Sequence, residues 1–380
     1  MLRTAITLVS FVWAASVAGQ TTELRLVQEL QIGHAGGTGP DVFGDVSDLA
    51  VDPHGRIYVL DAVMKAVRLF DRDGRFIREI APEGQGPGER RYRRDGFLGP
   101  ASITWDPIRG WLWIDDGRYF QVTDSLGVEH GRDARVSGGF DRNPGPMGKL
   151  IAVDSQNRIY EYQREPVGDT SYSYVARGVS AAGSPRTRYL DTLLIDARRM
   201  ITDDPRTTLR NIGSATVTMV MTSRRPDRDE HIWTVSPEGT VWIAPRQQRQ
   251  LYELTFAGDT IRAFDIDSEP AELDVSPEGW VWSRRVTDAA ESTWDLLDNC
   301  GASRGSVSVP YRVSVTEVGS DGELHVVRSD DLDIEYVMRF RLEGTPTRRS
   351  CRVRGRRLRI SVACGLPLSG HPDAKPQTAV

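Results

Sequence analysis

The chain has 380 residues, of which 39% are hydrophobic and 27% are charged, and its formal net charge is -5. These proportions are those of a folded globular protein, and they exclude wholesale disorder. Because the net charge provides no general attraction to nucleic acid, we expect no nucleic-acid partner. The 36 glycines and 21 prolines are typical of a fold with many short strands and turns.

Residues 1–19 have the pattern of a secretory signal peptide, with Arg3, an apolar run over 5–17, and the small residues Ser16 and Ala18 at the cleavage positions. The apolar run is shorter than the roughly 20 residues that a membrane span needs. We therefore expect a secreted or periplasmic protein with no membrane span after signal removal. An uncleaved N-terminal anchor is the alternative.

Residues 48–80 have the sequence pattern of one complete four-stranded unit. The turn Asp-Pro-His-Gly at 52–55 joins an apolar run to a strand at 57–60. A third strand at 67–70 is followed by an Asp-Gly hairpin turn, which returns the chain along 75–80. Such a small sheet cannot bury both of its faces alone, so we expect it to stack against copies of itself.

The strand-turn-strand core of this unit recurs along the chain, at residues 51–59, 105–114, 153–161, 235–243, 275–283 and 318–326. The turn residues of the copies lie mostly about 40 to 50 positions apart, which is the spacing of propeller blades. A second hairpin follows each core. The sequence therefore predicts an all-β fold, a six-bladed β-propeller of four-stranded antiparallel blades spanning residues 20–344.

The two ends of this propeller are predicted to pair. The last copy lacks its fourth strand, whereas residues 24–33 resemble the outer strand of the first unit and precede it. Pairing of this N-terminal strand with the last blade would close the ring and remove an exposed sheet edge.

The interval between Asn157 and Gly239 is longer than one blade. It could contain a degenerate seventh blade that uses residues 215–223. We favour a long insertion at about 191–230, because 191–214 reads as irregular or partly helical and lacks the turn motif.

Residues 345–380 form an Arg-rich stretch that we expect to be a basic, mobile C-terminal tail, although 357–363 alternates well enough to be an added strand. The three cysteines are Cys300, Cys351 and Cys364. The last two could form a disulfide in an oxidising compartment, but the odd number favours unpaired cysteines.

Four motifs of the chain resemble the NHL-repeat family. They are GTGPDVF (37–43), VDPHGRIYVLD (51–61), LFDRDGRF (69–76) and EGQGPGE (83–89). The whole chain is similar to exported bacterial six-bladed β-propellers of that type, with a closer match over 24–131 than over 150–343. The resemblance implies a propeller. It leaves the function open, because NHL propellers include ligand- and protein-binding platforms, nucleic-acid binders and metal-dependent enzymes such as amidating lyases.

In such a propeller, the loops between blades and the loops between second and third strands share one face. The loop at 81–96 contains the ligand-binding candidates Arg91, Tyr92, Arg93 and Arg94, whose guanidinium groups could hold an anionic polymer, a carboxylate or a phosphate. The alternative is a solvated loop that reflects the Arg bias of the chain.

Two runs of carboxylates are expected in equivalent loops of later blades: Asp265, Asp267 and Glu269, and Asp330, Asp331, Asp333 and Glu335. They could bind Ca²⁺, but neither has a recognisable metal-loop spacing. A solvated acidic rim is favoured, and we expect no cofactor.

Other patterns have ordinary structural explanations. The six histidines do not cluster in sequence, and Gly301–Gly305 matches the G-x-S-x-G elbow of serine hydrolases only at a hairpin turn, where the match is accidental. Trp113, Trp242 and Trp282 recur at one strand position, which favours packing between blades.

We therefore expect a non-catalytic, monomeric, exported propeller that binds a protein, peptide or carbohydrate ligand through its loop-bearing face. The alternative is a metal-dependent hydrolase or lyase at the mouth of the central channel. The repeated residues Asp52, Pro53, Gly55, Asp73 and Gly74 are expected to belong to the scaffold.

Overall fold

The computed structural model describes residues 24–84, 86, 89, 102–115, 119–134, 151–167, 170–180, 187–199, 206–212, 215–221, 231–245, 249–285, 290–298, 301–319 and 322–344. The predictions for the signal peptide, for the basic tail and for the three cysteines lie outside these residues. Among the residues that the structure describes, no helix is long and apolar enough to cross a membrane.

The described strands form six four-stranded antiparallel sheets, or blades, named here from the inner strand outwards. Blade one contains β2 (Val46–Val51), β3 (Ile57–Asp61), β4 (Ala66–Phe70) and β5 (Phe76–Ile80). Blade two contains β6 (Ser102–Asp106), β7 (Trp111–Asp115), β8 (Tyr119–Asp124) and β9 (Glu129–Ala134). Blade three contains β10 (Ile151–Val153), β11 (Arg158–Val167), β12 (Thr170–Ser180) and β13 (Thr187–Arg199).

Blade four contains β16 (His231–Val235), β17 (Val241–Pro245), β18 (Gln250–Leu254) and β19 (Thr260–Asp265). Blade five contains β20 (Pro270–Val275), β21 (Val281–Arg285), β22 (Ser292–Leu297) and β23 (Ser303–Val309). Blade six contains β24 (Val313–Val318), β25 (Leu324–Ser329), β26 (Glu335–Glu343) and, as its outer strand, the N-terminal β1 (Arg25–Ile32).

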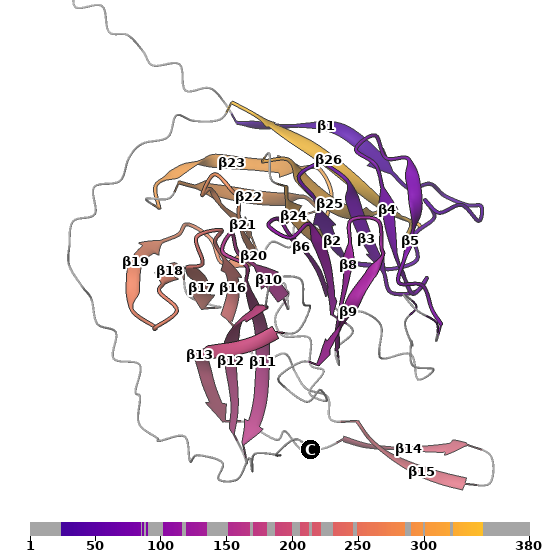
Figure 1. The fold of residues 1–380 in the computed structure, drawn as a ribbon, viewed down its shortest axis with the longest axis horizontal. Coiled ribbons are helices and arrows are strands. Elements are labelled where there is room, and N and C mark those ends of the chain that lie inside the picture. Colours follow the sequence, from indigo (N-terminus) through magenta and orange to yellow (C-terminus); the bar gives the residue numbers. More distant parts are fainter. Residues whose placement is uncertain are drawn as a thin grey trace, which may run out of the picture.

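The inner strands form a closed ring around a central axis (Figure 1). Each contacts the next, in the order β2, β6, β10, β16, β20 and β24, and β24 returns to β2. The chain is therefore a six-bladed β-propeller of four-stranded antiparallel blades, as the turn spacing predicts.

The ring is closed by pairing of the first described strand with the last. β1 runs antiparallel to β26, from Arg25 opposite Glu343 to Ile32 opposite Val337. Two short ion pairs accompany this pairing: Arg25 Nη2 lies 2.5 Å from Glu343 Oε2, and Arg341 Nε lies 2.6 Å from Glu29 Oε1. The predicted closure by the N-terminal strand is confirmed.

The expectation of irregular or partly helical structure over 191–214 is wrong. Residues up to Arg199 belong to β13, and 206–212 form β14. Two bulges interrupt the β12–β13 pairing and break the alternation that would have marked β13 as a strand. The seventh-blade candidate contains β15 (Ala215–Met221), which pairs only with β14 (Arg206–Ile212), in a two-stranded sheet that Figure 1 shows away from the ring.

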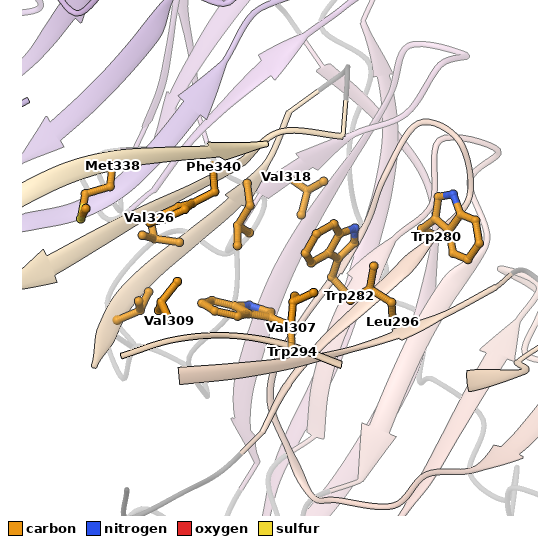
Figure 2. Close-up of a cluster of buried hydrophobic side chains, with 12 residues drawn as sticks. Trp280, Trp282, Trp294, Leu296, Val307, Val309, Val318, Val326, Met338 and Phe340 are labelled. Atoms are coloured by element: carbon orange, nitrogen blue, oxygen red, sulfur yellow. The ribbon is translucent and has the colours of Figure 1, made fainter. Parts of the chain in front are cut away.

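The buried apolar side chains fall into six clusters, and each cluster lies between two neighbouring blades. Figure 2 shows the cluster between blades five and six, in which Trp282 and Trp294 of blade five pack with Val318, Val326 and Phe340 of blade six. Trp113, Trp242 and Trp282 are all buried in such clusters. The predicted packing role of the recurring tryptophans is therefore confirmed.

Deletion of residues 24–33 is expected to open the ring. The deletion would expose the apolar faces of β26 and of the cluster that contains Ile32, and would cost on the order of 5 kcal/mol of unfolding free energy. Calorimetry should show a melting temperature lowered by about 10 °C or more. Gln28→Ala with Gln31→Ala, which changes only exposed side chains of β1, is the control. A deletion variant that melts like the parent would contradict closure by this strand.

Candidate ligand-binding face

Antiparallel pairing gives the propeller two different faces. The turns that join first to second strands, and third to fourth strands, lie at one end of the blades, which we call the turn face. The turns that join second to third strands, together with the connections between blades, lie at the opposite end, which we call the loop face.

The turn face is built from repeated capped turns. Asp52 Oδ1 accepts hydrogen bonds from the backbone N–H groups of His54 and Arg56, at 2.9 and 3.0 Å. Asp154 repeats the arrangement, and Gly55 has the positive φ of 74° that its turn position requires. In the other repeated hairpin, Asp71 and not Asp73 caps the turn. The repeated turn residues therefore serve the scaffold.

The outer strand of each blade ends at the loop face, where the inner strand of the next blade begins. The segments between these strands are residues 33–45, 81–101, 135–150, 200–230, 266–269 and 310–312. Their lengths and sequences do not repeat, in contrast to the turns at the opposite end.

The candidate residues Arg91, Tyr92, Arg93 and Arg94 lie outside the described residues. Parts of the chain just before them are described. Lys65 Nζ lies 3.1 Å from Glu83 Oε1, and the carbonyl oxygen of Glu89 accepts a hydrogen bond from Arg132 of β9. The chain before the Arg cluster therefore contacts both blade one and blade two.

The two carboxylate runs are not in equivalent loops, contrary to the sequence-based expectation. The run at 265–269 ends β19 and enters a connection between blades, whereas 330–335 is a turn within blade six. Asp330 caps this turn by accepting from the N–H groups of Leu332 and Ile334. Within the described part of the chain, no three His, Cys, Asp or Glu side chains are grouped to hold a metal ion.

The G-x-S-x-G match occupies the hairpin between β22 and β23. Gly301 has a positive φ of 73° in the turn, and Ser303 begins a strand. A nucleophile elbow needs a helix at this point, and so the match is accidental, as predicted.

The connection 33–45 folds across the boundary between blades six and one. Asp61, which is fully buried, accepts hydrogen bonds from the N–H groups of Gly44 and Asp45, at 2.9 and 3.3 Å. Glu335 of β26 accepts one from Val46 N at 2.5 Å. Buried carboxylates therefore hold the end of this connection from both blades.

A buried arginine of blade one also contacts this connection. Arg68 is only 2% exposed, lies 3.7 Å from Asp61, and donates from Nη1 to the carbonyl oxygen of Val42 at 2.5 Å. Its guanidinium also lies 5.8 Å from the centre of the Phe43 ring, which packs edge-on against Phe70. These contacts fix the backbone of the connection relative to blade one.

Three large apolar side chains are exposed in the two turns beside this connection. Val63 and Met64 of the β3–β4 turn are 60% and 50% exposed, and Leu332 of the β25–β26 turn is 77% exposed. We call these three residues, together with the exposed carboxylates Asp45, Asp331 and Asp333, the seam surface.

Sequence reasoning missed the seam surface. A usable indication was present, because Val63, Met64 and Leu332 are large apolar residues at turn positions, where small or polar residues are usual. Their exposure could not be read from the sequence, since it depends on how the 33–45 connection fits between the two turns.

Comparison with known proteins agrees with the architecture. A family model described as a 6-bladed beta-propeller matches residues 42–97, which include all of blade one. No curated protein matches the chain.

Solved structures with similar folds include a member of the DUF4221 family from Bacteroides vulgatus, at 8% identity and a TM-score of 0.47, covering 85% of this chain and 99% of that one. Virginiamycin B lyase from Staphylococcus aureus is 14% identical, with a TM-score of 0.42 and coverage of 83% and 88%. Regucalcin from Agrobacterium tumefaciens, a calcium-binding protein, is 12% identical, with a TM-score of 0.41 and coverage of 83% and 94%.

Glu335 is expected to make stability depend on pH. Its burial raises the pKa of the carboxyl above 4.5, with Asp45 and Asp61 adding to the shift and the hydrogen bond from Val46 opposing it. Because the folded state then holds the proton more tightly than the unfolded state, the parent loses stability as the pH rises through the folded pKa. Glu335→Gln keeps an acceptor for Val46 but cannot ionise.

The unfolding free energy of Glu335→Gln should therefore increase relative to that of the parent as the pH is raised from below 4.5 to neutrality. Urea denaturation over this range measures the difference. Glu79→Gln, which changes an exposed carboxylate of β5 away from the seam surface, is the control. A constant difference between Glu335→Gln and the parent at all pH values would contradict the assignment.

Proposed function

We propose that this chain is a non-catalytic, exported propeller of the NHL-repeat type that binds a protein, peptide or carbohydrate ligand through its loop face. The observation that carries the proposal is the contrast between the two faces. The first turn of a blade is capped by an aspartate, as at Asp52 and Asp154, or by a serine, as at Ser236 and Ser276, whereas the segments that join the blades differ in length and sequence.

The contrast favours recognition because a scaffold needs only the repeated part. Side chains such as Asp52 and Asp154 hold their own turns through hydrogen bonds to the backbone. Loops on a rigid scaffold are where binding residues are usually found, since they can vary without altering the core. The six inter-blade clusters provide that rigid scaffold.

The seam surface supports the same proposal. Its apolar side chains are exposed, although their turns are held by the carboxylates of Asp61 and Asp330. A fixed, partly apolar surface loses little conformational entropy when a ligand covers it. The export assigned to the protein is supported by the pattern of residues 1–19, and its monomeric state by the closure of the ring within one chain.

A capture experiment tests the choice of face. Biotinylated mature protein would be used to capture partners from the exported fraction, followed by mass spectrometry. Met64→Ala with Leu332→Ala should lose most of the captured partner, because two of the three exposed apolar side chains of the seam surface are removed. The matched variant Leu126→Ala with Val128→Ala removes similar exposed side chains from the turn face and should retain the partner.

Loss of the partner from the turn-face variant alone would overturn the assignment of the loop face. Metal analysis of the purified protein addresses the enzymatic alternative. A stoichiometric, tightly held ion would count against the non-catalytic proposal and favour a metal-dependent hydrolase or lyase.

The loop at 81–96, called here the Arg loop, gives a separate prediction. Replacement of Arg91, Arg93 and Arg94 by Ala should weaken partner capture without lowering the melting temperature, because three cations are removed from a connection and no repeated scaffold residue is changed. Capture and thermal unfolding would be measured on the same preparations. Unchanged capture would show that these arginines do not contact the partner.

A further inference from the structure

We propose that the seam surface docks a cationic peptide segment that carries apolar side chains. The inference rests on the proposed function, because it names the ligand class for part of the loop face. It depends on three properties of the seam surface: the position of its apolar side chains, their rigid presentation and the sign of the surrounding charge.

The apolar side chains lie in turns of neighbouring blades that one connection joins. A Cβ atom at Gly33 would lie 2.7 Å from the carbonyl oxygen of Glu335, and a Cβ atom at Gly44 would lie 2.8 Å from the Val63 side chain. The connection therefore packs against the start of β26, which follows the Leu332 turn, and against Val63 at its other end. The exposed apolar residues thus lie in the two turns that adjoin one connection.

Both turns present their apolar residue in the same manner. Asp61 Oδ1 accepts a hydrogen bond from Met64 N, and Asp330 Oδ1 accepts one from Leu332 N, each at 2.9 Å. The hydroxyl group of Tyr336 donates to Asp330 Oδ2 at 3.0 Å, which fixes the second carboxylate oxygen. Because the backbone is held at the exposed residue itself, docking does not require the turns to be ordered first.

The negative charges of the seam surface favour a ligand with positive charge. Asp331 and Asp333 flank Leu332, and Asp45 directly follows Gly44, so that carboxylates lie beside both apolar turns. Two nearby cations have carboxylate partners: His34 Nδ1 lies 3.1 Å from Asp41 Oδ2, and Lys65 pairs with Glu83. A third, Arg328 of β25, lies with its guanidinium 4.6 Å from the centre of the Tyr311 ring.

Such a surface attracts a peptide that carries Arg or Lys and repels an anionic one. The apolar side chains of the same peptide would cover Val63, Met64 and Leu332. The seam surface therefore favours a positively charged ligand, whereas the Arg loop favours a negatively charged one.

Fluorescence anisotropy with labelled peptides tests this assignment on the full mature chain. The probes are three eight-residue peptides that alternate Arg with Leu, Glu with Leu, and Arg with Ser. The Arg-Leu peptide should bind at least about tenfold more tightly than either of the others, because it alone supplies both charge and apolar contact. Its affinity should fall as salt is raised from about 0.05 M to about 0.3 M.

Variants of the full chain locate the binding. Met64→Ser with Leu332→Ser should weaken the Arg-Leu peptide about tenfold. Asp331→Asn with Asp333→Asn should weaken it about fivefold and reduce its salt dependence. Asn tolerates the positive φ of 59° at residue 333, so the second variant preserves the turn.

The matched control is Leu126→Ser with Val128→Ser on the turn face, which should leave the affinity unchanged. Thermal melting of every variant separates lost binding from lost fold.

Two results would overturn the proposal. Preferential binding of the Glu-Leu peptide would assign the loop face to an anionic ligand, and binding of no peptide would exclude the cationic class. In either case, partner loss from the loop-face variant in the capture experiment would still support the proposed function. Tighter binding of a peptide with the sequence of residues 345–363 would support the proposal and identify the cationic segment as the basic tail of the chain itself.

Discussion

The structure depends on one constraint: a four-stranded blade can bury its two faces only against neighbouring blades. Each of the six apolar clusters lies between two blades, and the cluster that contains Ile32, Val59 and Val337 forms only when blade six meets blade one. Every blade is therefore stabilised by two neighbours, and the circle must close for the first and last blades to be equally buried. The identity of the loops has no part in this requirement.

The separation of stability from recognition follows from the same constraint. Residues that pack the blades together, such as Tyr58, are buried. The hydroxyl group of Tyr58 lies within hydrogen-bond distance of both Asp52, which caps its turn, and the carbonyl oxygen of Ser125 in the next blade. The segments that join the blades do not have to repeat for the blades to pack. Asp61 and Glu335 use their carboxylates to hold a connection that occurs at one boundary only, and in doing so they fix the exposed turns on either side. These turns carry exposed apolar side chains, and exposed carboxylates lie beside them.

The sequence predicts the blades because their determinants are local and repeated. The turn motif at 52–55, the alternation at 67–70 and the spacing of the copies are readable without knowledge of distant contacts. Closure by residues 24–33 is also readable, because the last blade lacks a strand. The strand β13 is not, since its bulges remove the alternation, and the seam surface is not, since Leu332 and Val63 are brought beside the same connection only by closure of the ring.

Closure by the N-terminal strand also has a consequence in time. During synthesis β1 is made before the other strands of the ring, but Arg25 can pair with Glu343 only after the 318 residues that follow it have been synthesised. Until then β1 and β26 both present unpaired edges, and contacts of such long sequence separation form slowly. A β1 strand of one molecule could pair with β26 of another during this interval, which would exchange strands between copies. The last step of folding is therefore the one at which the local concentration of other copies matters most.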